Sequence, residues 1–274
     1  MRSLASLVVV ATLAGCDPPG ALVICHNANC AGSADPADDD ELTSLAASLA
    51  LTRGGRPLLD GVELDLYWSR ARGSCVYAHD AGQVERAPPA SAPADLVAAF
   101  LRDHPSPTFH GDRFTLFLEL KGTVARGTRH TASERASLAA CAFDVVARIG
   151  GKLHVVFDSA EPQLLRALVA EPRWRAVPEE DAPVTFALSA DFGSLVDGPD
   201  TQPLAAFHDL PLGVISLHPE WTTRTAYEAY RSLGVELCVW SYATTAATLD
   251  AVQRHAPRYI LTGEARFVRA WLER

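Results

Sequence analysis

Short apolar runs rich in β-branched residues recur along the chain and alternate with longer amphipathic stretches. Continuous apolar runs of about four to eight residues are typical of strands that are buried on both faces of a parallel sheet. These runs lie at 21–26, 61–68, 115–121, 152–158, 184–190, 212–218, 235–242 and 259–262. Helical periodicity occupies the intervals 41–51, 94–103, 132–148, 161–169, 222–233, 244–255 and 265–273.

Strands that alternate with helices in this way indicate an α/β protein with the (β/α)8 TIM barrel fold. The run 74–79 predicts an extra strand or an extended loop after the second barrel strand. Helical periodicity is poor over 191–211, so a loop can replace one helix there. Because a chain of 274 residues is long enough for one such barrel, we expect residues 16–274 to form a single domain.

The charge of the chain narrows the choice of partners. The formal net charge is −9, and phosphate backbones select basic surfaces, so we do not expect the protein to bind nucleic acid. Arginine supplies 22 of the 24 basic residues, and the two lysines are Lys121 and Lys152. We expect a monomer that acts on a small molecule.

The first residues describe an export signal. Arg2 precedes an apolar run from Leu4 to Leu13, and the tetrapeptide Leu-Ala-Gly-Cys ends at Cys16. A basic residue, an apolar run of about ten residues and small residues before the cleavage point are typical of a secretory signal. The arrangement resembles the signal of a bacterial lipoprotein, and an ordinary signal peptide is the alternative. We therefore expect residues 1–15 to be removed and a lipid on Cys16 to anchor the exported protein to a membrane of the cell envelope, at its periplasmic or outer face.

Five further cysteines follow: Cys25, Cys30, Cys75, Cys141 and Cys238. Export to an oxidising compartment permits disulfides, and an odd number leaves at least one thiol free or paired outside the chain. We expect Cys30 to pair with Cys75, because both lie near predicted strand ends that carry a histidine. The alternative is that these cysteines are small buried residues. No C-x-x-C occurs, so a metal–thiolate site is not favoured.

Charged residues interrupt two of the predicted strands. Glu63 and Asp65 alternate in GVELDLYW, and Glu119 and Lys121 alternate in LFLELKG, so each pair points to one side of its strand. In a TIM barrel the chemistry lies at the carboxyl ends of the strands. A buried carboxylate cluster repels itself unless it is protonated or holds a cation, and oxygen ligands favour Mg²⁺ or Ca²⁺. We predict that Glu63, Asp65 and Glu119 hold one divalent cation.

Two histidines are predicted to join this cluster. His26 ends the first apolar run and is followed by Asn27 and Asn29, while His79 closes the segment CVYAHD. A histidine at a strand end is more often a hydrogen-bonded core residue, but neighbouring carboxylates favour a role in proton transfer. We predict that His26 and His79 are the catalytic acid and base. Asn27 and Asn29 are expected to orient a ring or to contact phosphate.

Taken together, the motifs resemble the glycerophosphodiester phosphodiesterase family, within the phospholipase-C-like phosphodiesterase barrels. That family has a strand that ends in His-Arg-Gly, a Glu-x-Asp strand followed by His-Asp, a Glu-x-Lys strand, a Val-Trp-Thr strand and an Ile-x-Thr-Asp ending. The corresponding residues are His26-Asn27-Ala28, Glu63-Leu64-Asp65, His79-Asp80, Glu119-Leu120-Lys121, Val239-Trp240-Ser241 and Ile260-Leu261-Thr262-Gly263. The order and spacing of these motifs carry the resemblance over nearly the whole chain.

The resemblance implies metal-dependent hydrolysis of glycerophosphodiesters to an alcohol and glycerol 3-phosphate, with His26 and His79 transferring protons. It also implies that Lys121 steadies the phosphate, although Lys121 could instead simply pair with Glu119. Trp240 is either a platform for the substrate or a core residue.

The chain departs from the family pattern in its first motif. Asn27 replaces the arginine that helps to bind phosphate, and the acidic Pro-Glu-Asn-Thr-like stretch gives way to Asn29-Cys30 and to the aspartates at 38–40. The pattern His26-x-x-Asn29 is similar to the sphingomyelinase D branch, which usually carries aspartate where this chain has Glu119. Two alternatives therefore stay open: a sphingomyelinase D-like phospholipase acting on lysophospholipid-type substrates, and a catalytically silent envelope lipoprotein that binds phosphodiesters.

Other polar residues near predicted strand ends have simpler interpretations. We expect structural roles for His154, His218, Asp158 and Asp191. Asp80 either orients His79 or caps the turn that follows it.

Overall fold

The computed structural model describes residues 20–31, 38–88, 91–104, 107–111, 113–125, 128–150, 153–175, 184–189, 208–219, 222, 224–241 and 244–274. The predicted export signal, Cys16 and residues 191–207 lie outside these residues, as do Lys152 and Asp191.

Eight parallel strands close into a barrel, as the alternating pattern predicted. Each strand pairs in parallel with its neighbours, and β1 closes the ring by pairing with both β14 and β4. The strands are β1 (Leu22–Cys25), β4 (Gly61–Ser69), β7 (Phe114–Leu120), β10 (Leu153–Ser159), β11 (Val184–Ser189), β12 (Leu212–Leu217), β13 (Glu236–Trp240) and β14 (Tyr259–Thr262). The fold is a (β/α)8 TIM barrel.

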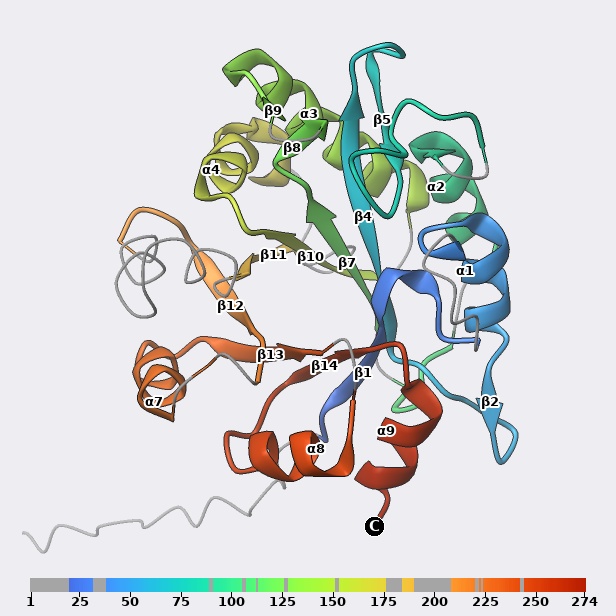
Figure 1. Ribbon diagram of the computed structural model, residues 1–274, viewed down its shortest axis with the longest axis vertical. Helices are drawn as coiled ribbons and strands as arrows, with labels where there is room; N and C mark the ends of the chain where they lie inside the picture. Colours follow the sequence, from blue (N-terminus) through green and yellow to red (C-terminus); the bar gives the residue numbers. More distant parts are fainter. Residues whose placement is uncertain are drawn as a thin grey trace, which may run out of the picture.

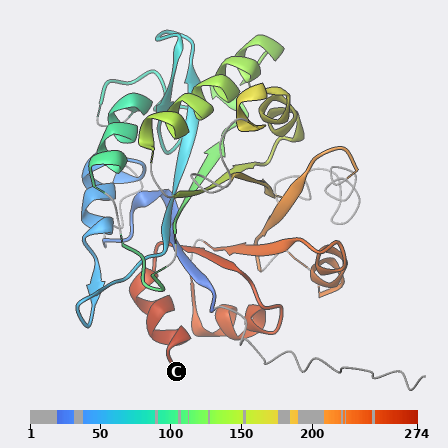
Figure 2. The same ribbon diagram turned by 180° about the vertical axis from the view of Figure 1, so that it is seen from behind.

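Helices surround the strands (Figure 1), and the view from behind shows the same arrangement (Figure 2). The predicted helices are confirmed wherever the structure describes them. They are α1 (Leu42–Leu49), α2 (Ala94–Asp103), α3 (Ala132–Ile149), α4 (Pro162–Ala170), α7 (Arg224–Ser232), α8 (Ala246–Gln253) and α9 (Ala265–Leu272), with short 3₁₀ helices η1 (His26–Ala28) and η3 (Pro172–Arg175). Within the described part of the chain, no helix has the length and apolar content needed to cross a membrane.

The longest helix, α3, shows how local sequence sets the ends of these elements. The Thr131 hydroxyl accepts a hydrogen bond from the Glu134 backbone at 3.2 Å, and the Glu134 carboxylate accepts one from the Thr131 backbone at 2.8 Å. This reciprocal capping satisfies two backbone donors at the start of the helix. Gly150 follows its last residue with a φ of 60°, a conformation that glycine adopts without strain.

Strand β4 continues beyond the barrel and forms a hairpin. Its residues Leu66–Ser69 pair antiparallel with β5 (Ser74–Tyr77), which β6 (Ala92–Pro93) extends. The β4–β5 hairpin projects past the other strands (Figure 1). The predicted extra strand at 74–79 is thereby confirmed, and β5 returns the chain to the barrel mouth at His79. Short hairpins β2–β3 (Thr52–Arg53, Arg56–Pro57) and β8–β9 (Thr123–Ala125, Thr128–Arg129) complete the fold.

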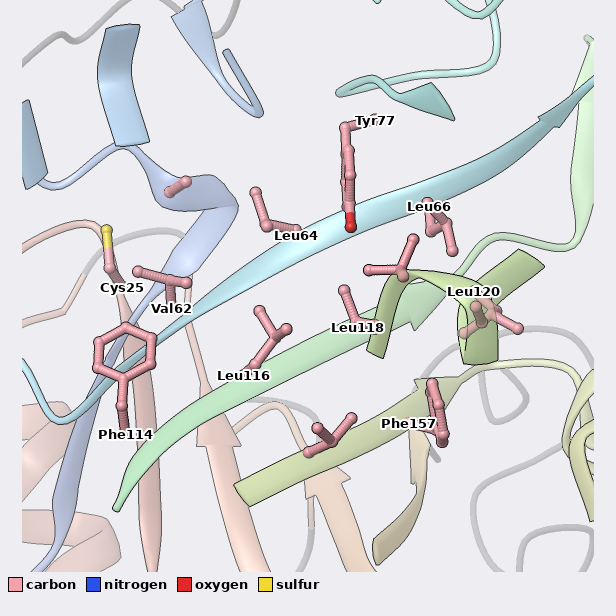
Figure 3. Packing of buried hydrophobic residues seen from close by; sticks show 14 of the residues in the cluster. Cys25, Val62, Leu64, Leu66, Tyr77, Phe114, Leu116, Leu118, Leu120 and Phe157 are labelled. Atoms are coloured by element: carbon pink, nitrogen blue, oxygen red, sulfur yellow. The ribbon is translucent and has the colours of Figure 1, made fainter. Parts of the chain in front are cut away.

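Alternation along the strands divides the apolar residues between two cores. The outward side chains of β4 and β7 pack beneath the helices (Figure 3): Val62, Leu64, Leu66, Leu116, Leu118 and Leu120. The inward side chains fill the barrel itself: Leu22, Ile24, Phe117, Val156, Ala187, Val214, Cys238, Trp240, Tyr259 and Leu261. Because side chains alternate with a period of two, the outward leucines of β4 force Glu63 and Asp65 to point inward.

A buried ion pair closes the amino-terminal end of the barrel, opposite the mouth. Arg269 and Asp60 are each only 1% exposed, and Nη2 of Arg269 lies 2.5 Å from Oδ2 of Asp60. The guanidinium also donates to the Leu58 carbonyl at 3.0 Å and stacks on the Phe109 ring at 3.9 Å. The second carboxylate oxygen of Asp60 lies 2.9 Å from Nδ1 of His110. The pair therefore ties α9 to the segments that precede β4 and β7.

The predicted disulfide between Cys30 and Cys75 is wrong. Cys25 pairs with Cys30, with 5.7 Å between their Cα atoms, and Cys75 pairs with Cys141, with 6.3 Å. The turn at η1 folds Cys30 back onto the end of its own strand. Cys75 lies on β5, which packs against α3 rather than against β1, so its neighbour is Cys141. Cys238 belongs to neither disulfide and is buried inside the barrel.

Candidate active site

A cavity of about 170 Å³ opens at the carboxyl ends of the strands. It brings together most of the residues that the sequence predicted for the site, namely His26, Asn27, Asp65, His79, Glu119, Lys121 and Trp240. It also contains Asp158, Ser189, Ser216 and Leu261. Glu63 and Asn29 are buried beside it, with 1% and 8% of their surfaces exposed. The predicted residues therefore converge on one cavity.

Three carboxylates form the most polar part of this cavity. Asp65 and Glu119 are register partners on β4 and β7, so their side chains lie next to each other, and Glu63 lies one inward position below. One oxygen atom from each carboxylate lies within 4.8 Å of the others. Oε1 of Glu63 is buried and has no hydrogen-bond partner among the described residues. Three hard oxygen ligands, one of them unsatisfied, fit Mg²⁺ or Ca²⁺.

Burial controls the protonation of these acids. It raises the pKa of Glu63 to about 8, and the carboxylates of Asp40 and Glu119 add to this effect. Burial also raises the pKa of Asp65 well above its usual range, against the opposing influence of Lys121. The Lys121 ammonium lies 3.0 Å from Asp65 and 2.7 Å from Glu119. Although burial favours the neutral amine, the surrounding carboxylates raise the pKa of Lys121, so it stays charged.

The first histidine lies in the turn that ends β1. Nε2 of His26 is 3.9 Å from Oε2 of Glu63, and its ring centre is 6.3 Å from that of Trp240. Burial, with a smaller contribution from the Lys121 charge, lowers the pKa of His26 to about 4. The imidazole is therefore neutral near pH 7 and can accept a proton.

The turn that carries His26 is held at both ends. Asn27 and Ala28 have φ angles of 50° and 53°, in the left-handed region that asparagine tolerates better than most residues. The backbone N–H of Asn27 donates to Oε2 of Glu63 at 2.7 Å, and the Cys25–Cys30 disulfide spans the turn. The strand ends in His26 because this cross-linked turn aims the side chain over the carboxylates.

The second histidine follows β5 and contacts an aspartate that the sequence analysis did not single out as a site residue. Nδ1 of His79 lies 3.1 Å from Oδ2 of Asp39. Asn27 and Asn29 donate to the two oxygens of the same carboxylate, at 3.0 Å and 2.8 Å. Asp80 instead accepts hydrogen bonds from the backbone of the turn after it, so of its two proposed roles the structure shows the cap.

Two further acids near the cluster were also missed. Asp40 is 2% exposed, its Oδ1 accepts from the Asp65 backbone at 2.9 Å, and burial raises its pKa well above the usual range. Asp158 was expected to be structural, yet it lines the cavity as the register partner of Glu119 and accepts from Ser189 at 2.9 Å. Burial and the charge of Glu119 raise the pKa of Asp158 to about 7. The signal for Asp158 was available, since it follows Val156 on the inward face of its strand.

The remaining candidates lie in two layers of the barrel. Trp240 lines the cavity and packs edge-on against His218, with 4.7 Å between ring centres, so it belongs both to the core and to the wall of the site. His154 lies lower, and its Nε2 is 2.9 Å from the hydroxyl of Thr185.

Comparison with known proteins gives a match in structure alone. No protein-family profile matches the chain, and no curated protein matches its sequence. A glycerophosphodiester phosphodiesterase from Parabacteroides distasonis aligns with 93% of this chain and 97% of its own, at 13% identity and a TM-score of 0.62. An Oleispira antarctica phosphodiesterase, solved in complex with the product sn-glycerol-3-phosphate, aligns over 92% and 97%, at 13% identity and a TM-score of 0.62.

A glycerophosphodiester phosphodiesterase from Thermotoga maritima aligns over 91% of this chain and 98% of its own, at 17% identity and a TM-score of 0.54. In each case the alignment spans nearly the whole of both chains. The chain therefore has the TIM-barrel fold seen in solved glycerophosphodiester phosphodiesterases.

Proposed function

We propose that the protein is a metal-dependent phosphodiesterase of the glycerophosphodiester phosphodiesterase family, which hydrolyses glycerophosphodiesters to an alcohol and glycerol 3-phosphate. One observation carries the proposal: two histidines, three carboxylates and a lysine, carried on or directly after β1, β4, β5 and β7, meet at a single cavity at the barrel mouth. The fold shared with solved enzymes of this activity supports it, and one of those structures contains glycerol 3-phosphate.

Glu63, Asp65 and Glu119 would hold the divalent cation. When bound, the cation supplies positive charge that offsets the negative charge developing on the phosphoryl oxygens. Lys121 already contacts two of these acids, so its ammonium is close enough to bind a phosphate oxygen from the same side.

The two histidines would move the protons. His26 is neutral near pH 7, so it suits the base that takes the proton from the attacking hydroxyl or water. His79, when it is also protonated on the ring nitrogen that faces the cavity, would donate that proton to the oxygen of the departing alcohol. The proton lost by the nucleophile and the proton gained by the leaving group then balance over the reaction.

Hydrolysis of glycerophosphocholine and bis-p-nitrophenyl phosphate tests the proposal. Activity should disappear in EDTA and return with Mg²⁺ or Ca²⁺, and Glu119→Gln should remove it. Release of glycerol 3-phosphate from glycerophosphocholine would support this proposal. Release of choline from lysophosphatidylcholine or sphingomyelin, without turnover of glycerophosphocholine, would indicate a sphingomyelinase D-like enzyme. Binding of the diesters without turnover under any metal would identify the silent lipoprotein and refute the enzyme.

We also propose that the protein is an envelope lipoprotein anchored through Cys16. The chain enters the barrel at Leu22, the first residue of β1, which lies at the end opposite the mouth. A lipid on Cys16 would therefore precede the strand that enters the barrel at the end opposite the mouth. Intact-mass analysis of the exported chain decides this, because an N-terminus other than Cys16, or one without added acyl mass, contradicts the anchor.

A further inference from the structure

The carboxylate of Asp39 lies between the turn after β1 and the histidine after β5. Its Oδ2 accepts from Nδ2 of Asn27 at 3.0 Å and lies 3.1 Å from Nδ1 of His79, while its Oδ1 accepts from Nδ2 of Asn29 at 2.8 Å. Asn27 and Asn29 are 7% and 8% exposed, and the side chain of Asp39 is 14% exposed. Three donors from two separate segments thus converge on one carboxylate.

This arrangement decides which nitrogen of His79 carries the proton. An ionised carboxylate only accepts hydrogen bonds, so Nδ1 must donate to Asp39. Nδ2 of Asn27 lies 3.3 Å from the same ring nitrogen and could donate to it only if Nδ1 carried no proton. The contact with Asp39 is shorter and involves a charged acceptor, so it favours the proton on Nδ1. In the neutral ring, Nε2 then carries the lone pair, and His79 lines the cavity. Nε2 is therefore the nitrogen that takes up the catalytic proton and, in the charged ring, donates it.

The backbone of His79 is fixed independently of Asp39. Its N–H donates to the side chain of Gln83 at 3.0 Å, and Asp80 caps the turn that follows. These backbone contacts do not fix the rotation of the imidazole about the side-chain bonds of His79. Asp39 supplies the contact that fixes it.

We propose that Asp39 is a positioning residue for His79: it holds the ring in the tautomer that presents Nε2 to the cavity and offsets the positive charge of the ring during proton transfer. Asn27 and Asn29 hold Asp39 in place, which assigns these amides to the histidine rather than to the phosphate. The tautomer stands on the geometry alone, whereas its catalytic consequence rests on the proposed phosphodiesterase function.

The test compares Asp39→Asn with Glu41→Gln, which makes the same carboxylate-to-amide change two residues away. Among the described residues, the Glu41 carboxylate accepts a hydrogen bond from the Thr43 hydroxyl. In the intact protein labelled with ¹⁵N-histidine, the His79 signal, assigned with His79→Gln, should show the proton on Nδ1. Asp39→Asn should shift that tautomer and Glu41→Gln should leave it unchanged. A neutral His79 ring with its proton on Nε2 in the unchanged protein would overturn the proposal whether or not the protein is active.

Kinetics provide the second readout. Asp39→Asn should lower kcat by roughly a hundredfold to ten-thousandfold, the range seen when the carboxylate partner of a catalytic histidine is removed, with KM and metal affinity within about twofold. Combined with His79→Ala it should cost nothing more, because both changes remove the same proton transfer. If the role of Asp39 were merely structural, Asp39→Asn would instead raise KM, weaken metal binding and lower kcat further when combined with His79→Ala.

If Asp39→Asn does not fold, Asn29→Ala provides the test, because it removes one hydrogen-bond donor to Asp39. It should show the same tautomer shift and a smaller loss of kcat. An unchanged His79 tautomer in that variant would contradict the proposed role of Asp39.

Discussion

At the scale of single residues, the site contains more carboxyl groups than the positive charge of Lys121 can neutralise. Glu63, Asp65 and Glu119 face Lys121, and Asp40 and Asp158 add two more carboxyl groups close by. In a buried cluster, such groups are neutral or compensated. Protons and a divalent cation therefore compete for the same oxygens, and the response of the site to pH follows from that competition.

We predict that metal affinity rises with pH and that binding releases protons. Without metal, the pKa of Glu63 is about 8, so near pH 6 this carboxyl holds a proton that the cation must displace. Calorimetry in two buffers of different ionisation enthalpy measures the protons released. Glu119→Gln should weaken binding sharply. Affinity that is independent of pH between about 6 and 8, or that survives Glu119→Gln unchanged, would contradict the ligand assignment.

Thermal stability of the metal-free protein should fall as the pH rises. A carboxyl whose folded pKa lies above its unfolded value stabilises the protein fully below the unfolded pKa and loses this effect as the pH rises through the folded pKa. Glu63, with a folded pKa of about 8, and Asp158, at about 7, both place this loss between about pH 5 and pH 8. In EDTA the Tm should decline across that window, and saturating Mg²⁺ or Ca²⁺ should flatten the decline. A Tm in EDTA that climbs over this range would refute the prediction.

His26 should be required for turnover and dispensable for metal binding. Its low pKa keeps the imidazole neutral near pH 7, in the form that a general base needs. His26→Ala should lower kcat by at least about a hundredfold, the lower end for loss of a general acid or base. Its effect should not add to that of His79→Ala. His104→Ala, at the exposed end of α2, is the control, and full turnover by His26→Ala would make His26 a core histidine.

At the scale of elements, two disulfides brace the parts of the chain that leave the barrel near its mouth. Cys25–Cys30 closes the turn that carries His26, and Cys75–Cys141 ties β5, which leads to His79, to α3. Each catalytic candidate therefore follows directly from a cross-linked segment. The β4–β5 hairpin also has its antiparallel pairing, its packing on the helices and the ion pair of Arg70 with Glu134.

Breaking the longer bridge should cost more stability than breaking the shorter one. In the loop-entropy description, a disulfide between cysteines separated by 66 positions in the sequence is worth about 4 kcal/mol, and one between cysteines separated by 5 positions about 2 kcal/mol. Urea unfolding of Cys75→Ser/Cys141→Ser should show the larger loss. Cys25→Ser/Cys30→Ser should lose less stability but more kcat, because it loosens the turn under His26. Equal effects of the two variants on kcat would contradict this division.

The elements themselves were predictable, whereas their cross-links were not. Alternation in GVELDLYW fixed the inward position of Glu63 and Asp65, because a strand admits only two faces. Pairing of Cys75 depends on α3 passing behind β5, a tertiary contact between residues far apart in sequence. Asp39 lies in an irregular segment before a helix, so no periodic pattern in the sequence could predict its contact with His79. The pattern of residues within one strand or helix therefore predicts which side chains share a face. Contacts between different elements can be known only once the fold is known.

At the scale of the whole molecule, the two ends of the barrel have different tasks. The mouth contains more carboxyl groups than the charge of Lys121 offsets, so a cation can bind there, whereas Arg269 and Asp60 pair with each other at the opposite end. In TIM barrels generally, residues at the carboxyl ends of the strands perform the chemistry, and residues at the opposite end contribute to stability. It implies that substitutions at the closed end change stability and leave the chemistry intact.

Arg269→Met tests this division. Removing one partner of a buried ion pair leaves the other charge uncompensated, which typically costs about 3–5 kcal/mol, whereas an exposed pair contributes about 1 kcal/mol or less. Arg269→Met should therefore lower the free energy of unfolding by an amount in the buried range, because it also leaves the Leu58 carbonyl without this donor. Arg266→Met, at an exposed position of the same helix, is the matched control and should change little.

Turnover separates this role from one at the mouth. Per folded molecule, kcat for glycerophosphocholine should be the same in Arg269→Met as in the unchanged protein, because Asp60 precedes β4 at the end of the barrel away from the carboxylates. The charge that Arg269→Met uncovers is that of Asp60, so adding Asp60→Asn should recover part of the lost stability. A loss of stability no larger than that of Arg266→Met would show that the pair does not close the barrel. A fall in kcat at unchanged stability would show that the two ends are coupled.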